Sequence, residues 1–387
     1  MSIRAALTFV LAVIALPSWG ASVSTSNPLG SSPNMVDRLV MLDTAEEWEG
    51  GSGNSAHVSG DRVVMGPAPG EWAKGVGRRY PARGRWQTQE IEADFPFTEV
   101  LPSWNADVPP DTGIRFEIRV RDAASPEWSP WLHMGSWGRI THRPDRTVSF
   151  EHGTVNVDVL TLDQPADAIQ MRAEFQDFNL PHLPRGEGPA LRRLAICCSG
   201  AVEDPEEHAA LMPPVEIEGE WARTLPVPHH GQGVLGRPLS GLCCSPTSLT
   251  MVLQSLGSEC TLEENTQAVF DPEYAIFGNW GRNVARAGEL GFDAWLTRFR
   301  SWDQVRAEIA AGNPVIASVR IEEGEITGIT YDGGHLVVIR GFTPEGDVVI
   351  NDPAYSERGE GSVWLADEMA TVWFDHGGVA YMIRPRE

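Results

Sequence analysis

Two adjacent cysteines, Cys243 and Cys244, stand at the beginning of a segment that has the pattern of a helix. The segment reads GLCCSPTSLTMVLQSLG, and the first turn of a helix accommodates a proline such as Pro246 without losing a hydrogen bond. This places Cys244 at the N-cap or just before it, where unpaired N–H groups and the helix dipole favour a thiolate. Cys243 lies one residue further out and gains less from both effects. Cys244 is therefore the predicted nucleophile.

A thiolate nucleophile needs a histidine as base or counter-ion, and a third group that orients this histidine. The candidate base is His335, which follows two glycines and begins the apolar run HLVVIRGF. We expect a register in which Phe342 faces Asp347 across the turn to the next strand. In this register Asp352 lies opposite Val337, on the same face as His335 and diagonal to it, within reach of the imidazole. A shift of one residue would place the two side chains on opposite faces.

Each of these residues also has a purely structural interpretation. A cysteine at a helix start is more often structural than catalytic, and a histidine such as His335 at the head of an apolar strand is often a satisfied core residue. Asp352 precedes Pro353 and is an ordinary residue to begin a turn. Only the ordered combination of Cys244, His335 and Asp352 favours the catalytic interpretation.

The first twenty residues have the layout of a secretory signal peptide. Arg4 precedes an apolar run over 5–16, and small residues suit a cleavage site before Ala21. The run is short for a membrane span, and a buried N-terminal helix is the alternative interpretation. We therefore expect residues 1–20 to be removed, and the mature chain to be soluble, without a membrane span, and secreted or periplasmic.

Five cysteines in an oxidising compartment leave at least one thiol without a disulfide partner within the chain. We expect Cys244 to be the free thiol and the other four to be available for disulfides. Adjacent Cys197 and Cys198 cannot easily bond to each other without strain. One of them could pair with Cys243 or Cys260 and tie two domains together, but the connectivity stays open.

Length and periodicity predict two domains, because 387 residues are enough for about two cores. Residues 21–36 are rich in serine, proline and glycine and are expected to form a flexible leader. The region 37–200 is predicted to be an all-β antiparallel sandwich, jelly-roll-like in type, because apolar residues alternate with polar ones in several short runs. The clearest of these predicted strands are 113–122, 154–162 and 168–175.

A proline- and acid-rich linker is expected over 201–222, followed by a second domain over 223–387. Leu249, Val252, Leu253 and Leu256 have helical spacing, and Gly257 is suited to end that helix. Further helices are predicted from the capping box TLEE at 261–264 and in the runs WGRNVARAGELG and SWDQVRAEIAAG. Strand-like runs follow in PVIASVRI, HLVVIRGF, DVVIND and VAYMIRP. Helices first and strands after them predict an α+β domain.

Composition and isolated motifs restrict the partners. A net charge of −23 argues against nucleic acid or an anionic membrane surface as partner. Adjacent His229 and His230 do not point the same way in regular structure, and no cysteine or carboxylate cluster supports a tetrahedral site, so no metal or other cofactor is expected. Seven tryptophans fall within 37–200. Exposed indoles such as Trp128 could contact sugars or the cell wall, although a buried core explains their number equally well.

The ordered motifs resemble those of the bacteriocin-processing-type branch of papain-like cysteine peptidases. CSPTS opening an apolar helix, GGHLVVIRGF and GDVVINDPA carry the resemblance, which is greatest to exported, stand-alone members with an N-terminal β domain. The runs GNWGRNVARAGELGFDAW, IAAGNPVIASV and VWFDHGGVAYMIRP are similar in order and spacing. In the first half, SWNADVPPDTG and WSPWLHMGSWG also resemble the β domain of those proteins. Nearly the whole mature chain is covered.

The resemblance implies an α+β papain-like fold for 223–387 and a role for four residues. Cys244 is implied as nucleophile, His335 as general base and then acid, and Asp352 as the residue that orients His335. Gln232, the only glutamine upstream of Cys244 in this domain, is implied as a donor to the oxyanion. Two features depart from the family. Relatives usually have an aromatic residue where Cys243 stands, and the chain shows no transporter segment, so the Gly-Gly leader substrate does not carry over.

These features predict an exported cysteine peptidase that hydrolyses peptide or related amide bonds through a thioester intermediate. Its partner is then a peptide or protein substrate, with possible glycan contact through the N-terminal domain. Two alternatives stay open. One is a catalytically silent, papain-like binding protein, against which the intact set of Cys244, His335 and Asp352 argues. The other is acyl transfer or deamidation at the same site.

Overall fold

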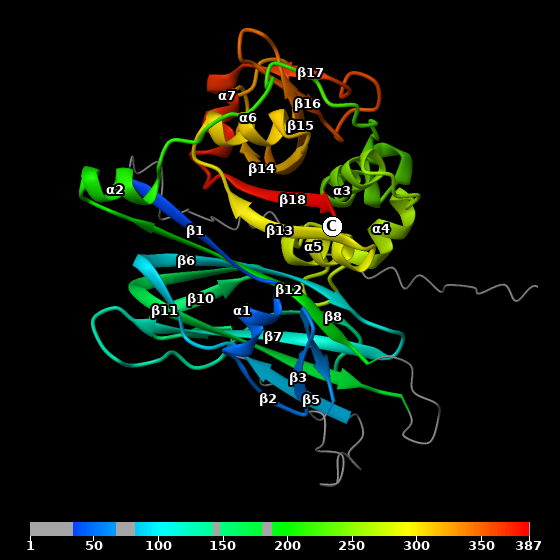
Figure 1. Ribbon diagram of the computed structural model, residues 1–387. Helices are drawn as coiled ribbons and strands as arrows, with labels where there is room; N and C mark the ends of the chain where they lie inside the picture. Colours follow the sequence, from blue (N-terminus) through cyan, green and yellow to red (C-terminus); the bar gives the residue numbers. More distant parts are fainter. Residues whose placement is uncertain (1–33, 67–81, 142–147, 180–187, 387) are drawn as a thin grey trace, which may run out of the picture.

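The computed structural model describes residues 34–66, 82–141, 148–179 and 188–386, which build one domain on a twelve-stranded sheet and another on a six-stranded sheet (Figure 1). The predicted signal peptide and residues 21–33 of the predicted leader lie outside the described residues. The last two residues of the predicted leader, Met35 and Val36, already belong to the first strand and are buried. No helix among the described residues is long and apolar enough to cross a membrane.

The N-terminal domain is almost entirely β-structure, as alternating apolar residues predicted, with one short helix, α1 (Ala45–Glu49). Its strands are β1 (Met35–Leu42), β2 (Ser52–Asn54), β3 (Ala56–Ser59), β4 (Arg62–Met65), β5 (Ala82–Gln87), β6 (Ile91–Asp107), β7 (Thr112–Asp122), β8 (Leu132–Gly138), β9 (Ser149–Phe150), β10 (Gly153–Asn156), β11 (Val159–Asp177) and β12 (Ala190–Ala201). All pairings between them are antiparallel.

These strands are hydrogen-bonded into one continuous sheet, whereas the sequence predicted a sandwich of two. The long strand β6 pairs with β11 along its first part and with β12 along its second. β11 pairs with β10, β7, β5 and β6 at different points along its length, with shifts of register between Thr161 and Ala168. Most of β7 is buried on both faces. The sheet therefore folds over its own core, because bulged long strands can bend from one part of a sheet to the next.

The predicted strand over 154–162 is instead a tight hairpin. β10 ends at Asn156 and β11 begins at Val159, with Gly153 paired to Leu162. Val157 at the tip has a φ of 57°, a left-handed conformation that is strained for a β-branched residue. The alternation of apolar residues continues across this two-residue turn, so the sequence pattern contained no break. The turn carries Asp158 to the boundary with the second domain.

The C-terminal domain places five α-helices around a mostly buried antiparallel sheet. Its helices are α3 (Cys244–Ser255), α4 (Leu262–Val269), α5 (Trp280–Glu289), α6 (Trp302–Ala310) and α7 (Ala366–Trp373). Its strands are β13 (Phe292–Arg298), β14 (Val315–Ile321), β15 (Gly333–Phe342), β16 (Val348–Asn351), β17 (Ser362–Trp364) and β18 (Val379–Pro385), in the spatial order β13-β18-β14-β15-β16-β17. Two 3₁₀ turns, η2 (Gln232–Leu235) and η3 (Leu239–Gly241), precede α3.

Local capping signals located the helices of this domain well. Thr261 and Glu264 form the predicted capping box at α4, and Ser301 and Gln304 form another at α6. Glycines with positive φ follow α3, α5 and α6, and Gly257 has a φ of 91°. Such glycines satisfy the backbone geometry at a helix end without steric cost.

Several elements were not predicted. The segment expected as a linker contains α2 (Pro205–Leu211), which Asp204 caps through its side chain. The strands β13 and β17 and the helix α7 also had no prediction. β13 is short and follows a helix directly, and β17 has three residues, so neither offers a long periodic pattern.

The N-terminal domain covers the outer edge of the six-stranded sheet. The Asn105 side chain accepts from the Ala294 N–H at 3.0 Å and donates to the Ala294 carbonyl at 2.8 Å. Ser103 Oγ accepts from the Leu296 N–H at 2.9 Å. These bonds from β6 satisfy backbone groups of β13 that face away from β18. Side chains of one domain thus pair with the edge strand of the other, as a further strand would.

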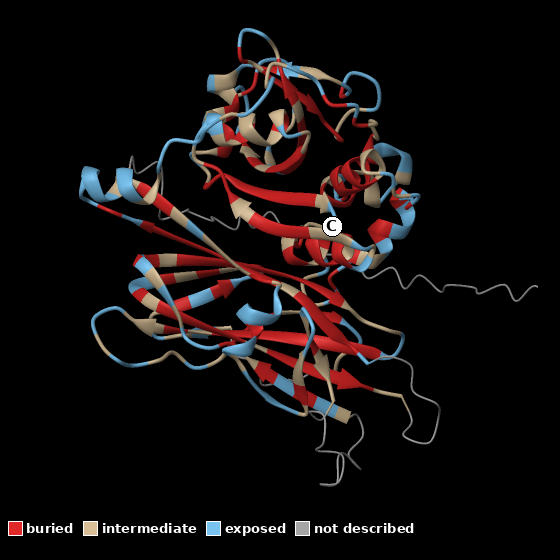
Figure 2. Cartoon of the chain, viewed as in Figure 1, coloured by how far each residue is buried: buried red, intermediate tan, exposed pale blue. Residues whose placement is uncertain are grey.

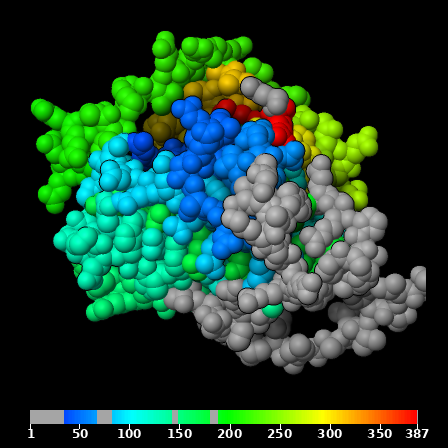
Figure 3. All heavy atoms as spheres, turned by 60° about the horizontal axis from the view of Figure 1, so that its bottom comes forward, coloured from blue at the N-terminus to red at the C-terminus, as the bar shows by residue number. Residues whose placement is uncertain are grey.

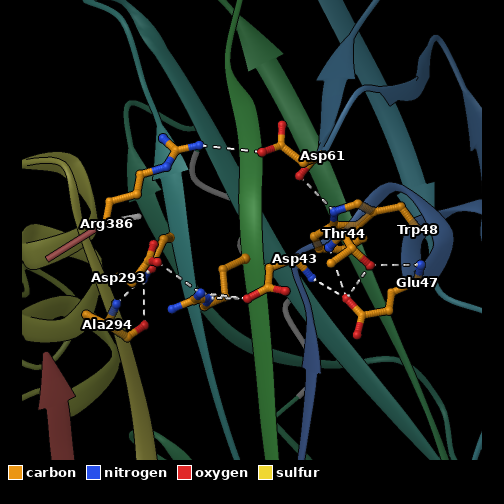
Figure 4. A network of polar contacts seen from close by, with 10 residues as sticks. Asp43, Thr44, Glu47, Trp48, Asp61, Asp293, Ala294 and Arg386 are labelled. Atoms are coloured by element: carbon orange, nitrogen blue, oxygen red, sulfur yellow. Dashed lines mark hydrogen bonds and ion pairs between the residues drawn. The ribbon is translucent and has the colours of Figure 1, made fainter. Parts of the chain in front are cut away.

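Ion pairs and apolar packing complete this contact. Figure 4 shows the polar network around Asp43 and Asp293, both of which lie within 3.2 Å of Arg193. Arg298 of β13 contacts Glu99 of β6 at 2.6 Å, and both side chains are buried. Figure 2 shows that buried residues continue from β6 and β12 into β13 and α5. Figure 3, in which the bottom of Figure 1 is turned forward, shows that residues of the first half of the chain form most of the coloured surface on that side.

Candidate active site

Cys244 is the first residue of α3, one position further into the helix than the sequence indicated. Cys243 is the N-cap, since the Thr247 N–H already bonds to the Cys243 carbonyl at 3.0 Å. Burial raises the pKa of the Cys244 thiol, but a hydrogen bond and charge attraction from His335 outweigh it. The N–H groups of Leu336 and Ser245 also donate to the sulfur. The pKa of Cys244 is therefore lowered, which favours the thiolate.

Cys243 has the opposite environment, although it is adjacent in sequence. Its side chain is fully buried, and burial together with the neighbouring charge of Cys244 raises the pKa of its thiol to about 12. A hydrogen bond with the Thr266 side chain opposes this only in part. Cys243 is thus held as a neutral thiol, and the pKa values of the two adjacent thiols are shifted in opposite directions.

His335 lies near the start of β15, facing the N-terminus of α3, and is 5% exposed. Its Nε2 bonds to Asp352 Oδ1 at 2.8 Å, which leaves Nδ1 for Cys244. Burial lowers the pKa of this imidazole, but hydrogen bonds with Asp352 and Cys244 and the charges of both raise it to about 9. Because the pKa of Cys244 is lowered and that of His335 is raised, the site favours a thiolate–imidazolium pair at neutral pH.

Asp352 follows β16 directly and is 1% exposed. Burial raises the pKa of its carboxyl group, but the charge of His335 and the hydrogen bonds from His335, Ala354 and Tyr331 outweigh that effect. The pKa of Asp352 is therefore lowered. Besides His335, the Ala354 N–H donates to Oδ1 at 2.9 Å and the Tyr331 hydroxyl donates to Oδ2 at 2.9 Å. A carboxylate with this many donors keeps its charge and its orientation when buried.

The register that brings His335 and Asp352 together differs at the turn from the expected one. Phe342 pairs with Val348, not with Asp347. A bulge after Ile339 then shifts the pairing by one residue, so that Val338 pairs with Asn351. This second register is the one that the prediction required. Without the bulge, the two catalytic candidates would lie on opposite faces of the sheet.

Gln232 lies in η2 and is tied to the same site through its backbone. Its N–H donates to the carbonyl of Pro353, the residue after Asp352, at 2.8 Å. The side chain is 9% exposed, and its Oε1 is buried without a hydrogen-bond partner among the described residues. The backbone of Gln232 is thus fixed at the Asp352 loop, and its side-chain oxygen is not used in a hydrogen bond to any described residue.

Tyr331 is a site residue that sequence reasoning missed. Its ring centroid lies 4.7 Å from that of His335, while its hydroxyl donates to Asp352. Burial and the Asp352 charge raise the pKa of this phenol, so it stays a donor. Tyr331 precedes β15 in the run GITYDGGH, which has no periodicity. The nearest signal was its position four residues before His335.

Family models match both halves of the chain. A family model described as Peptidase_C39 like family matches residues 224–381, and one described as Peptidase C39 N-terminal domain matches residues 38–199. The chain belongs to the C39-like peptidases. The predicted resemblance is thereby confirmed for both halves of the chain.

Similarity of this C39-like peptidase to solved structures is remote. A double glycine motif protease from an AMS/PCAT transporter, solved with its leader peptide, is 19% identical with a TM-score of 0.33, and the match covers 44% of this chain and 100% of that one. The Emp47p carbohydrate recognition domain is 9% identical with a TM-score of 0.20, covering 43% and 96%. Carbohydrate-binding modules of the β-sandwich superfamily are 12% identical with a TM-score of 0.16, covering 43% and 56%. No curated protein matches the chain.

The histidine pair beside the site is used in hydrogen bonding. His229 Nε2 bonds to the Asp352 carbonyl oxygen at 3.0 Å, and His230 Nε2 bonds to Gln254 Oε1 at 2.7 Å. No cluster of three metal-binding side chains occurs in the part of the chain that the structure describes. In this C39-like peptidase the pair connects the segment before η2 to the Asp352 loop and to α3.

The expectation of disulfides was wrong. All five cysteines, each within the described ranges, are free. Cys197 and Cys198 point to opposite faces of β12, so one packs in the core shared with the peptidase domain and the other in the core of the β-rich domain. Cys260 Sγ accepts from Asn265 at 3.2 Å. Except for Cys244, the cysteines serve as small apolar core residues.

The tryptophans do not form a bare platform. Trp104 and Trp137 are buried, at 3% and 4% exposed. Trp128 and Trp131 are partly exposed, but the Arg119 guanidinium lies over both rings, at 4.7 and 4.9 Å. These two indoles are thus covered by a cation, which leaves them little face for stacking on a sugar.

Proposed function

We propose that this protein is an exported cysteine peptidase that hydrolyses peptide or related amide bonds at Cys244. In this proposal its C-terminal domain is papain-like, with a nucleophile helix packed against a sheet that presents the histidine and the orienting carboxylate. The proposal rests on the hydrogen-bonded series Cys244–His335–Asp352. Membership of a peptidase family supports the same conclusion.

The first half of the reaction is acylation. The Cys244 thiolate attacks the carbonyl carbon of the scissile bond, and a tetrahedral oxyanion forms. His335 then donates its Nδ1 proton to the leaving nitrogen, which departs as a free amine and leaves a thioester on sulfur. The Asp352 carboxylate stays hydrogen-bonded to Nε2 throughout. It keeps the ring from rotating, and its negative charge stabilises the imidazolium.

The second half is hydrolysis of the thioester. Neutral His335 accepts a proton from water through Nδ1, and the resulting hydroxide equivalent attacks the thioester carbon. Collapse of the second tetrahedral intermediate expels the Cys244 thiolate and releases the carboxylic acid. The imidazolium is then restored beside the thiolate, which is the starting state.

Two donors are proposed for the oxyanion. The Cys244 N–H lies in the first turn of α3, where backbone N–H groups lack partners within the helix. The Gln232 side-chain amide supplies the second donor, and its backbone attachment to Pro353 fixes its place relative to the triad. Donors held in advance of the reaction stabilise the developing charge without reorganisation.

The decisive experiment compares the two adjacent cysteines. The mature chain, 21–387, is treated with a thiol-directed peptidase probe and incubated with a peptide pool, beside Cys244→Ala and Cys243→Ala. We expect Cys244→Ala to lose labelling and to reduce hydrolysis by at least about 10³-fold. Cys243→Ala should retain both within about threefold, although the cavity it leaves lowers the free energy of unfolding by about 1–2 kcal/mol.

Three results would overturn parts of the proposal. Labelling that survives in Cys244→Ala but is lost in Cys243→Ala would show that Cys243, not Cys244, is the nucleophile. Labelling at Cys244 without cleavage of any peptide would favour the silent binding protein. Formation of new amide bonds with added amines, in place of acid products, would favour acyl transfer. Export is tested separately, by sequencing the N-terminus of the protein recovered outside the cytoplasm, which should begin at Ala21.

A further inference from the structure

A cavity of about 650 Å³ lies between the two domains, and none of the proposed catalytic residues lines it. The β-rich domain contributes Trp104 of β6, His133 of β8 and Asp158 at the hairpin tip. The peptidase domain contributes Asp271 and Glu273 from the segment before α5, with Arg282 of α5. A cavity of this volume is typical of a small-molecule site.

His133 lines this cavity and carries a ring donor that is not used in a hydrogen bond to any described residue. It is 4% exposed, and its Nδ1 accepts from Arg115 Nε at 3.1 Å, so the ring proton resides on Nε2. Nε2 is buried and has no hydrogen-bond partner among the described residues, although Glu273 Oε2 lies 3.4 Å away. A buried donor without an acceptor is costly, and a ligand oxygen at this position removes the cost.

Trp104 presents a second unused donor. It is 3% exposed, and its Nε1 also lacks a partner within the described part of the chain. The Cζ2–Cη2 edge of its ring faces Gly135 and Gly281, which both line the cavity. A side chain at Gly135 would come within 3.1 Å of that ring edge. Because both positions are glycine, no side chain there lies between this edge of the indole and the cavity.

Three charged groups of the wall already have hydrogen-bond partners. Asp158 accepts from the N–H groups of Trp280 and Gly281 at the N-terminus of α5, although burial and the nearby Asp271 charge raise its pKa to about 7. Asp271 accepts from the Asn279 side chain at 2.7 Å. Arg282 donates to the carbonyls of Ser136 and Val269 at 3.1 Å. The two buried side-chain atoms of the wall that lack a hydrogen-bond partner among the described residues are the N–H donors of His133 and Trp104.

We propose that the interdomain cavity binds a neutral sugar residue, through hydroxyl groups that His133 Nε2 and Trp104 Nε1 donate to. A hydroxyl is the group that fits beside His133, since one oxygen can accept from Nε2 and donate to the Glu273 carboxylate. A carboxylate has room for several such bonds. The C–H face of the sugar packs on the apolar parts of the wall. This site goes beyond the proposed peptidase activity and does not depend on it.

Binding is measured by calorimetry on the mature chain, with cellobiose, N,N′-diacetylchitobiose and tetraglycine as probes. Glu273→Gln removes the charged acceptor, and His133→Phe removes the donor but keeps a ring. Glu323→Gln makes the same chemical change at an exposed residue outside the cavity. We expect one or both disaccharides to bind wild type, with affinity reduced about tenfold in each cavity variant. Glu323→Gln and Cys244→Ala should bind as wild type does.

The opposite outcomes are equally clear. If neither disaccharide binds, the proposal is wrong. If binding is the same in Glu273→Gln and His133→Phe as in wild type, the sugar lies elsewhere. If only tetraglycine binds, and the cavity variants weaken it, the cavity is a peptide subsite. Glu273→Gln alone decides the matter should His133→Phe fail to fold, because the Glu273 side chain is less buried.

Discussion

Two histidines in this protein each face a carboxylate, and their surroundings give them different chemistry. His335 bonds to Asp352 at 2.8 Å through Nε2 and to Cys244 through its other nitrogen. His133 receives a hydrogen bond from Arg115 on Nδ1, and its Nε2 lies 3.4 Å from Glu273 without a hydrogen bond. Both rings are buried to a similar degree. A histidine–carboxylate pair alone therefore does not identify a catalytic site.

The third group decides between the two roles. Beside His335 it is a thiol that can give up its proton, so the ring can become an imidazolium. Beside His133 it is a guanidinium, which occupies the Nδ1 lone pair and cannot accept a proton. In the proposed reaction the first arrangement transfers protons, whereas the second fixes the tautomer of a ring that lines the cavity. Three changes test this difference, beginning with the largest effect.

Removing the carboxylate should separate the two pairs most strongly. Asp352→Ala should reduce kcat/KM by on the order of 10²- to 10⁴-fold, because His335 loses its orientation and its charge partner. Asp352→Asn should be milder, since an amide oxygen can still accept from Nε2. Glu273→Gln should change hydrolysis less than about twofold. Equal losses in Asp352→Ala and Glu273→Gln would mean that both pairs serve the reaction.

The ionisation of the thiol should depend on one histidine only. With the Cys244 pKa lowered and the His335 pKa raised to about 9, the ion pair exists between these values. Alkylation of Cys244 by iodoacetamide should therefore be fast at neutral pH, and kcat/KM should fall as the pH rises through about 9. His335→Gln should slow alkylation at pH 7 at least about tenfold, because the Cys244 pKa returns toward the usual thiol range. His133→Phe should leave the alkylation profile unchanged. A similar shift in both variants would contradict the distinction.

The smallest effect should come from Tyr331, which acts through Asp352. Tyr331→Phe keeps the ring on His335 but removes one donor to the carboxylate. We expect kcat/KM to fall about fivefold, with the acid limb of the pH profile moved upward, because the Asp352 pKa rises. Tyr355→Phe is the matched control, since the Tyr355 ring contacts that of Tyr331 and its hydroxyl bonds to Thr330 rather than to the Asp352 carboxylate. The bond from the Tyr355 N–H to the Asp352 carbonyl, at 3.4 Å, is kept in this variant. A loss of activity without a change in the acid limb would limit Tyr331 to a packing role.

The parts of the site that the sequence predicted depend on local patterns. Pro246 in the first turn, an apolar helix face and Gly257 at the end located α3, and the glycine pair before His335 marked the start of β15. The bulge after Ile339 could not be predicted, because β15 is a nearly continuous apolar run, and without alternation an extra residue leaves no mark in the sequence. The turn shifts the register by one residue from the predicted one, and the bulge shifts it back. The predicted pairing near Asp352 was correct only because these two shifts cancel.

What the sequence did not predict depends on contacts between distant residues. Tyr331 does not lie in a periodic sequence pattern. Its role depends on the hydrogen bond to Asp352, a residue that comes close to it only in the folded protein. The hairpin at Val157 was hidden by continuous alternation, although it delivers Asp158 to α5. The cavity requires both domains, so no single segment contains its pattern. Free thiols also differed from expectation: Cys197 and Cys198 pack in different cores, and each cysteine except Cys244 is buried.

The contact that Asn105 and Ser103 make with β13 has a practical consequence for expressing the C-terminal domain of this protein by itself. A peptidase domain expressed alone from residue 223 would present the outer N–H and C=O groups of β13 to solvent, together with the apolar surface under β6. Exposed edges of this kind recruit strands from other molecules, so the fragment should form aggregates. Polar substitutions on that surface, or a covering helix fused to it, offer a way to obtain a soluble fragment.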